Sequence, residues 1–161
     1  MAKKTEKPSI STGSIARNKK AYFNFEIVEK IEAGISLKGS EVKSVRAKQI
    51  DLEGSYARLK GHEVFLVGCK IATYPQAGKN NHEPIRDRKL LLHKSEINKI
   101  RGKLQQRGFT LVPLRVYFNA RGIAKVEIGL AHGKKQFDKR DKLRQDQQKR
   151  DAARSMKYYK R

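Results

Sequence analysis

Four histidines and one cysteine are the residues with which this chain could ligate a metal ion or perform acid–base chemistry. None of His62, His82, His93 and His132 lies at metal-ligand spacing from another histidine or from Cys69. A single cysteine excludes an internal disulfide and the zinc sites that need several cysteines. Two histidines are followed by a glutamate, but adjacent residues do not share a face of a strand, so these pairs predict a nuclease only weakly. We expect no metal, no cofactor and no catalysis.

Two glycine-containing stretches approach the spacing of a phosphate-binding loop without its chemistry. In residues 34–40 the glycines have the right separation, but Ser40 stands where the lysine belongs. In residues 129–135 the glycines are one residue too close, and Lys135 stands where a serine or threonine belongs. We interpret both sets of glycines as turn residues.

The charge of the chain favours recognition of a polyanion. Its 161 residues include 38 Lys and Arg against 16 Asp and Glu, a net charge of +22. Residues 131–161 carry a net +8 and residues 1–130 a net +14, so the body is basic as well as the tail. Binding to a membrane surface needs a helix with an apolar face, and crossing a membrane needs about 20 consecutive apolar residues. The sequence has neither feature. We expect a soluble, cytoplasmic monomer that binds nucleic acid.

Three clusters carry residue types that recognise RNA. Bases stack on aromatic rings while cations hold phosphates, and residues 18–23 combine Asn18, Lys19, Lys20 and Tyr22 in one segment. An alternative is that the aromatic residues of this segment only open the first core strand. The other two clusters are basic: Arg86, Arg88 and Lys89, then Lys134, Lys135, Lys139 and Arg140.

Short strands and one or two helices must position these clusters. Apolar alternation and turn residues predict strands over residues 25–31, 56–60, 64–67, 109–119 and 126–130. Gly34 predicts a bend, and Pro113 an edge or a bulge. Helices are predicted over residues 40–47, with Ser40 as N-cap, and 95–107, while polar residues 74–88 predict a functional or disordered loop. The chain is therefore expected to be mainly β, a small barrel with peripheral helices.

The tail has a different pattern. Each of its four aspartates has a basic residue three or four positions later, which suits a helix. No apolar residue recurs on one face, so such a helix has little to pack against the body. We expect the tail to be disordered when free and to fold against a polyanion, although a plain solubilising tail remains an alternative.

Several long motifs, in order over about residues 13–140, resemble the SsrA-binding protein family. They are IARNKKA (15–21), IEAG (31–34), GSEVKSVRA (39–47), DLEGSYA (51–57), PIRDRKLLLH (84–93), GFTLVP (108–113) and GLAHGKKQFDKR (129–140). The resemblance implies an OB-type antiparallel β-barrel with peripheral helices. It implies binding to the tRNA-like part of transfer-messenger RNA (tmRNA), and delivery of that RNA to stalled ribosomes for rescue and peptide tagging. The elongation factor that carries aminoacyl-tRNA is a further expected partner.

The resemblance also implies which residues face each partner. Asn18, Lys19, Glu32, Leu91 and Lys125 would face the RNA, and Lys20, Tyr22, Arg86, Arg88 and Lys89 join them from the clusters above. Glu32 could accept hydrogen bonds from base amino groups or ribose hydroxyls, or pair inside the barrel. Leu91 could pack on a splayed base or belong to the core. Gly133, Lys134, Lys135, Asp138, Lys139 and Arg140 would face the ribosome at the decoding centre and mRNA channel, with Gly133 as the hinge.

The expected organisation has three parts: a flexible segment over residues 1–16, an RNA-binding barrel over 17–132 and a basic tail over 133–161, helical on the ribosome. The sequence departs from the family pattern at Phe137, where a histidine is common, at Tyr22 and Phe23, and over residues 74–82. Two other functions remain open: a constitutive structural RNA-binding protein of the ribosome, and a small nuclease.

Overall fold

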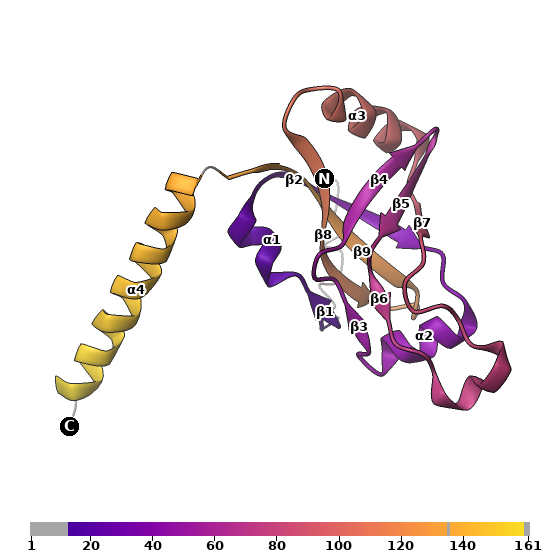
Figure 1. Ribbon diagram of the computed structural model, residues 1–161, viewed down its shortest axis with the longest axis horizontal. Helices are drawn as coiled ribbons and strands as arrows, with labels where there is room; N and C mark the ends of the chain where they lie inside the picture. Colours follow the sequence, from indigo (N-terminus) through magenta and orange to yellow (C-terminus); the bar gives the residue numbers. More distant parts are fainter. Residues whose placement is uncertain (1–12, 135, 160–161) are drawn as a thin grey trace, which may run out of the picture.

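A computed structural model describes residues 13–134 and 136–159 of the chain (Figure 1). The strands are β1 (Ala16–Arg17), β2 (Phe25–Ile35), β3 (Ile50–Asp51), β4 (Tyr56–Lys60), β5 (Glu63–Val67), β6 (Lys70–Ile71), β7 (Arg88–Leu91), β8 (Phe109–Phe118) and β9 (Ala124–Gly133). The helices are α1 (Lys19–Asn24), α2 (Gly39–Arg46), the 3₁₀ helix η1 (Pro75–Asn80), α3 (Lys94–Leu104) and α4 (Gln136–Tyr159).

One antiparallel sheet organises the body. Its strand order is β1-β8-β4-β5-β7-β2-β9, and β8 pairs with β9 as well, so the pairings lead back to β8. The apolar side chains on the inner face form the core, in which Val64, Leu66, Leu111 and Ile128 are fully buried. Helices α2 and α3 lie at opposite ends of the sheet (Figure 1). The predicted mainly β, antiparallel class with peripheral helices is confirmed.

A second, smaller apolar cluster lies on the other face of the sheet, under α1. Ala21 of α1 packs there with Val112, Leu114 and Ala131. Gly129 makes this packing possible, because a Cβ at this position would lie 3.1 Å from Leu114 Cδ1 and equally close to a side chain of β2. Helix α1 therefore covers one end of the outer face and leaves the remainder for polar residues.

Two predicted features near β2 are wrong. The strand does not bend at Gly34 but continues through it, pairing with Leu91 on one side and Lys125 on the other. Helix α2 begins at Gly39, so Ser40 is not its N-cap. The carboxylate of Glu41 satisfies the start of the helix instead, since it accepts the Lys38 backbone N–H at 2.7 Å.

The predicted hairpins are confirmed, and so is the irregularity in β8. Strands β4 and β5 pair around a turn at Gly61, whose φ of 62° is left-handed. The pairing of β8 with β9 shifts register between Pro113 and Arg115, as the proline predicted. Because of this shift Leu114 joins the outer cluster while Val116 joins the core, although the alternation predicted one face for both.

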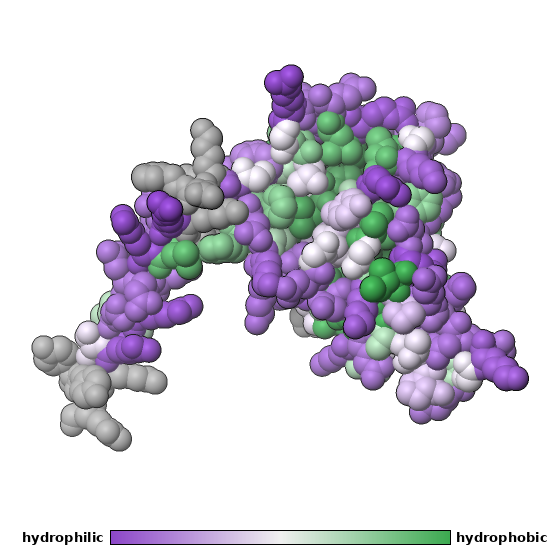
Figure 2. Space-filling view, viewed as in Figure 1, coloured by the Kyte–Doolittle hydropathy of each residue, from purple (hydrophilic) through white to green (hydrophobic). Residues whose placement is uncertain are grey.

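Helix α4 extends away from the body (Figure 1), and hydrophilic side chains cover most of it (Figure 2). Its apolar residues Leu143 and Met156 are exposed. A helical tail agrees with the spacing of its charges, while its disorder in the free chain stays a prediction. In the described parts of the chain no helix has both the length and the apolar character to cross a bilayer.

Candidate nucleic-acid interface

A strip of polar side chains lies across the outer face of four neighbouring strands. Antiparallel register aligns Glu32 of β2 with Glu127 of β9, then Arg115 of β8, then Arg17 of β1. Residues two positions away along a strand share its face. We call the resulting set the outer strip; its members are Arg17, Lys30, Glu32, Arg115, Tyr117, Lys125 and Glu127.

Glu32 is held by two neighbours of the strip yet stays accessible. The hydroxyl of Tyr117 donates a hydrogen bond to Glu32 Oε2, and Lys125 Nζ lies 3.3 Å from Oε1. The hydrogen bond from Tyr117 is the main reason why the pKa of Glu32 lies below its ordinary value, with Lys125 adding to the effect. The Glu32 side chain is 54% exposed. It is therefore an oriented, ionised acceptor that a base amino group or a ribose hydroxyl can reach.

Two contacts hold the Tyr117 side chain in place, one at its hydroxyl group and one at its ring. Burial, and then the hydrogen bond to Glu32, raise the pKa of its hydroxyl to about 12, so it remains a donor at neutral pH. The guanidinium of Arg115 lies 5.0 Å from the centre of the Tyr117 ring, within the range of a cation–π contact.

A cleft of about 630 Å³ lies between the outer strip and α3. Its walls include Glu32 and Lys125 from the strip, and Lys89 and Leu91 from β7. Leu91 is 54% exposed, so it is not a core residue, and Gly34 beneath it leaves room for its side chain. The structure thus brings four of the predicted RNA-facing residues, Glu32, Lys89, Leu91 and Lys125, into one hollow, which Glu63 and Glu96 also line.

The predicted cluster at residues 18–23 divides into structural and exposed members. Asn18 is buried: its Oδ1 accepts the Ala21 N–H at 3.1 Å and its Nδ2 donates to the Leu52 carbonyl. This N-cap role uses its polar groups inside the protein, so the expected RNA contact of Asn18 is not supported. Lys19 and Lys20 are exposed, and Lys20 pairs with Glu53.

Tyr22 lies in α1, so it does not open the first core strand, which begins at Phe25. It is 40% exposed, and Lys30 Nζ lies 5.6 Å from the centre of its ring. The ring therefore borders the outer strip.

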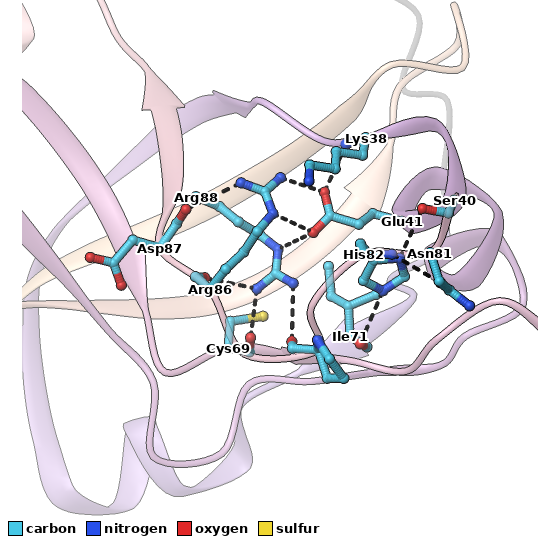
Figure 3. Close-up of polar contacts among 11 residues, drawn as sticks. Lys38, Ser40, Glu41, Cys69, Ile71, Asn81, His82, Arg86, Asp87 and Arg88 are labelled. Atoms are coloured by element: carbon cyan, nitrogen blue, oxygen red, sulfur yellow. Dashed lines mark hydrogen bonds and ion pairs between the residues drawn. The ribbon is translucent and has the colours of Figure 1, made fainter. Parts of the chain in front are cut away.

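Arg88 and Arg86, both predicted to face RNA, both bind Glu41 (Figure 3); the Arg86 side chain is 25% exposed, so its RNA contact stays a prediction. Arg88 is fully buried; its Nε lies 2.9 Å from Glu41 Oε1, and its Nη1 donates to the Cys69 carbonyl at 2.6 Å. Arg86 donates to both carboxylate oxygens of Glu41. Burial alone would raise the pKa of Glu41, but the bonds from Arg86 and the Lys38 N–H, with Arg88 nearby, hold it below its ordinary value. Arg88 cannot reach a phosphate, because protein oxygens occupy its donors.

In the candidate nuclease pair His82–Glu83 the histidine is internal, whereas the glutamate is exposed. His82 is buried, with Nδ1 2.9 Å from Ser40 Oγ and Nε2 3.2 Å from the Ile71 carbonyl. Cys69 is a buried core residue, as expected, and burial raises the pKa of its thiol to about 11. In residues 13–134 and 136–159 no three His, Cys, Asp or Glu side chains are grouped so that they could hold a metal ion.

The start of the predicted tail is tied to α1. The Lys134 backbone N–H donates to the Asn24 carbonyl at 3.0 Å, and its Nζ donates to the Tyr22 carbonyl. Gly133 ends β9, Asp138 and Lys139 lie in the first turns of α4, and Arg140 is exposed there. Lys135 lies outside the described residues.

Besides Glu127, sequence reasoning missed four members of the strip: Arg17, Lys30, Arg115 and Tyr117. The signal for two of them was present, since Arg115 and Tyr117 alternate with the apolar residues of the predicted strand 109–119. The position of the other two follows only from the pairing of β2 and β1 with distant strands.

The family model described as SmpB protein matches residues 15–158. An SsrA-binding protein from Symbiobacterium thermophilum is 51% identical over 142 residues, which cover 88% of this chain and 90% of that protein. One from Rickettsia canadensis is 53% identical over 140 residues, covering 87% and 92%. A chain of the solved structure "tmRNA-SmpB: a journey to the center of the bacterial ribosome" has a TM-score of 0.64 and 51% identity, over 75% of this chain and 85% of that one. Since the family model matches residues 15–158, which include the strands that carry the outer strip and the cleft, the chain belongs to the SmpB protein family.

Proposed function

We propose that this protein is a non-catalytic RNA-binding factor of trans-translation, which binds the tRNA-like domain of tmRNA and delivers it to stalled ribosomes. The observation that carries the proposal is the cleft, where Glu32, Leu91 and Lys125 meet. The names of the relatives support it, since they are SsrA-binding proteins, and so does the similar chain from a tmRNA and ribosome structure.

The cleft suits an RNA with bases displaced from their stack. A splayed base can pack on the exposed Leu91 side chain while its polar edge meets the Glu32 carboxylate. Lys89 and Lys125 supply positive charge for the backbone beside it, although each also pairs with a glutamate, Lys89 with Glu63 and Lys125 with Glu32. Folded RNAs with loops offer such bases, whereas a regular duplex does not.

The proposed organisation keeps an OB-type barrel, expected over residues 17–132, as the RNA-binding part, followed by a tail over residues 133–161. Of the segment 1–16 that was expected to be flexible, residues 1–12 lie outside the described residues, and Ile15 and Ala16 pair with Val116 of β8, so this part belongs to the sheet. The tail, with Gly133 as its hinge, enters the mRNA channel near the decoding centre and is helical there. The elongation factor that carries aminoacyl-tRNA joins the complex, and the protein acts in the cytoplasm as a monomer.

A binding experiment tests the RNA assignment. The tRNA-like domain of tmRNA and a random RNA of equal length and charge compete for the full chain at moderate salt. Preference for the tRNA-like domain is expected. Equal binding of both RNAs would contradict the proposal, since a surface with net charge +22 binds any polyanion to some degree.

A truncation tests whether the body binds the RNA while the tail acts on the ribosome. Removing residues 136–161 while retaining Lys134 keeps its bonds to α1. The truncated protein should bind the tRNA-like domain within about threefold of the full chain, since the residues removed lie outside the cleft, and peptide tagging on stalled ribosomes should be lost. Loss of RNA affinity instead would place the main RNA contact on the tail.

A further inference from the structure

A second hollow lies on the outer face, between α1 and the strands β1, β8 and β2. It has a volume of about 490 Å³ and is lined by Arg17, Tyr22, Lys30, Leu114, Arg115 and Glu127. None of these residues lines the cleft described above. The two hollows are neighbours, because Glu32 of the cleft and Glu127 of this hollow are register partners on β2 and β9.

The hollow has more positive than negative charge. Three cations, Arg17, Lys30 and Arg115, face a single carboxylate, that of Glu127. Glu127 is only 9% exposed; Arg115 Nε lies 2.6 Å from its Oε2, and Lys30 Nζ lies 3.6 Å from its Oε1. This carboxylate is thus taken up in orienting two cations, and within the described residues Arg17 has no ion pair.

The sheet places two arginines against each other. Arg17 and Arg115 are direct register partners on β1 and β8. Like charges directly opposite on neighbouring strands destabilise a sheet, and an anion between them would relieve this repulsion. The backbone there is fixed, because the Ile15 N–H donates to the Val116 carbonyl and the Asn18 N–H to the Leu114 carbonyl, both at 2.8 Å. The hollow therefore offers a preformed position for a negative group.

We propose that this hollow binds one phosphodiester of the RNA between Arg17 and Arg115, with the adjoining nucleoside against Tyr22. The inference rests on the proposed function and adds a second contact point to it. Arginine suits this task, because its planar fork donates to two phosphate oxygens at once. Glu127 leaves the terminal nitrogens of Arg115 for the ligand, since it accepts from Nε.

The test compares Arg17→Gln, Arg115→Gln and the double variant of the full chain, bound to the tRNA-like domain of tmRNA over a series of salt concentrations. Each single variant should bind about tenfold more weakly, with a shallower salt dependence, because one phosphate contact is lost. The double variant should lose little more than either single one, because a phosphate gripped by two arginines depends on both. Arg17 is exposed and has a like-charged register partner, so its substitution should not lower the melting temperature, even if that of Arg115 does.

Arg107→Gln is the matched control, because Arg107 is an exposed arginine after α3 and lies outside both hollows. It should change RNA affinity less than twofold. If Arg17→Gln and Arg107→Gln weaken binding equally, or the two arginine losses simply multiply, the hollow is only part of a diffuse positive surface and the inference is wrong. Either result can occur while the wild type still prefers the tRNA-like domain. Only the loss of that preference would overturn the proposed function.

Discussion

Two glutamates of this protein are each held by two hydrogen-bonding or charged side chains, but their surroundings are opposite. Glu41 in α2 binds two arginines and is fully buried, whereas Glu32 in β2 binds a lysine and a tyrosine and is 54% exposed. In both cases the neighbours lower the pKa of the carboxyl group. Burial decides what the ionised group does: Glu41 joins segments of the fold, and Glu32 remains available to a ligand.

The comparison shows why charge alone identifies a binding surface poorly. Arg86 and Arg88 have the residue types of a phosphate site, yet they connect β7 and the segment before it to α2 through Glu41. A buried charge needs a partner of opposite sign, and α2 supplies it. The exposed strip, by contrast, has more cations than acids and can accept an anion.

The largest effect is expected where the buried glutamate is removed. Glu41→Ala leaves two arginines without their counterion, one of them fully buried, so the free energy of unfolding should fall by about 3–5 kcal/mol. Chemical denaturation measures this loss. Glu53→Ala is the control, because Glu53 pairs with Lys20 at an exposed site, and should cost at most about 1 kcal/mol. Equal losses in the two variants would remove the distinction between buried and exposed glutamates.

The second effect should appear in binding and not in stability. Glu32→Gln keeps the shape of the side chain but removes its charge, so binding of the tRNA-like domain should weaken about tenfold, or roughly 1.4 kcal/mol. The free energy of unfolding should change by no more than about 1 kcal/mol, because the side chain is more than half exposed. Titration of labelled RNA together with denaturation measures both quantities. A large loss of unfolding free energy with unchanged RNA affinity of the folded protein would give Glu32 a structural role.

The smallest effect concerns the pKa of Glu32. Tyr117→Phe removes the hydrogen bond that chiefly lowers the pKa of Glu32, so this pKa should rise toward its ordinary value of 4.5. A carboxyl with a lowered folded-state pKa stabilises the protein above its ordinary pKa, and this contribution is lost as pH falls through the folded-state value. The variant should therefore lose part of the pH dependence in that acidic window. Carbon NMR of the Glu32 carboxyl measures the shift, and an unchanged pKa would show that Tyr117 does not hold it.

The sequence predicts the body better than the site. Strands whose apolar residues alternate were found, because period-two burial is a local property. The bulge between Pro113 and Arg115 was anticipated, but its effect on which face Leu114 takes was not, because it depends on the partner strand. Gly34 was expected to bend the chain, yet a strand with neighbours on both sides continues through it.

Some of the predicted site residues lie in the cleft, whereas others are buried. Glu32, Leu91 and Lys125 were assigned through the family resemblance, and the structure brings them into one cleft. Asn18, assigned through the same resemblance, and Arg88, assigned from a basic cluster, have equally suitable residue types, but both are buried with their polar groups in use. Only the fold reveals which polar residue has already found a partner within the chain.

The burial of Cys69 has a practical corollary. Its thiol is inaccessible and its pKa is raised to about 11, so little of the reactive thiolate forms at neutral pH. Cys69 should therefore react very little with maleimide reagents. A single cysteine introduced on α4 would accept a fluorophore selectively, and the motion of that helix against the body could be followed in solution without first engineering the native thiol away.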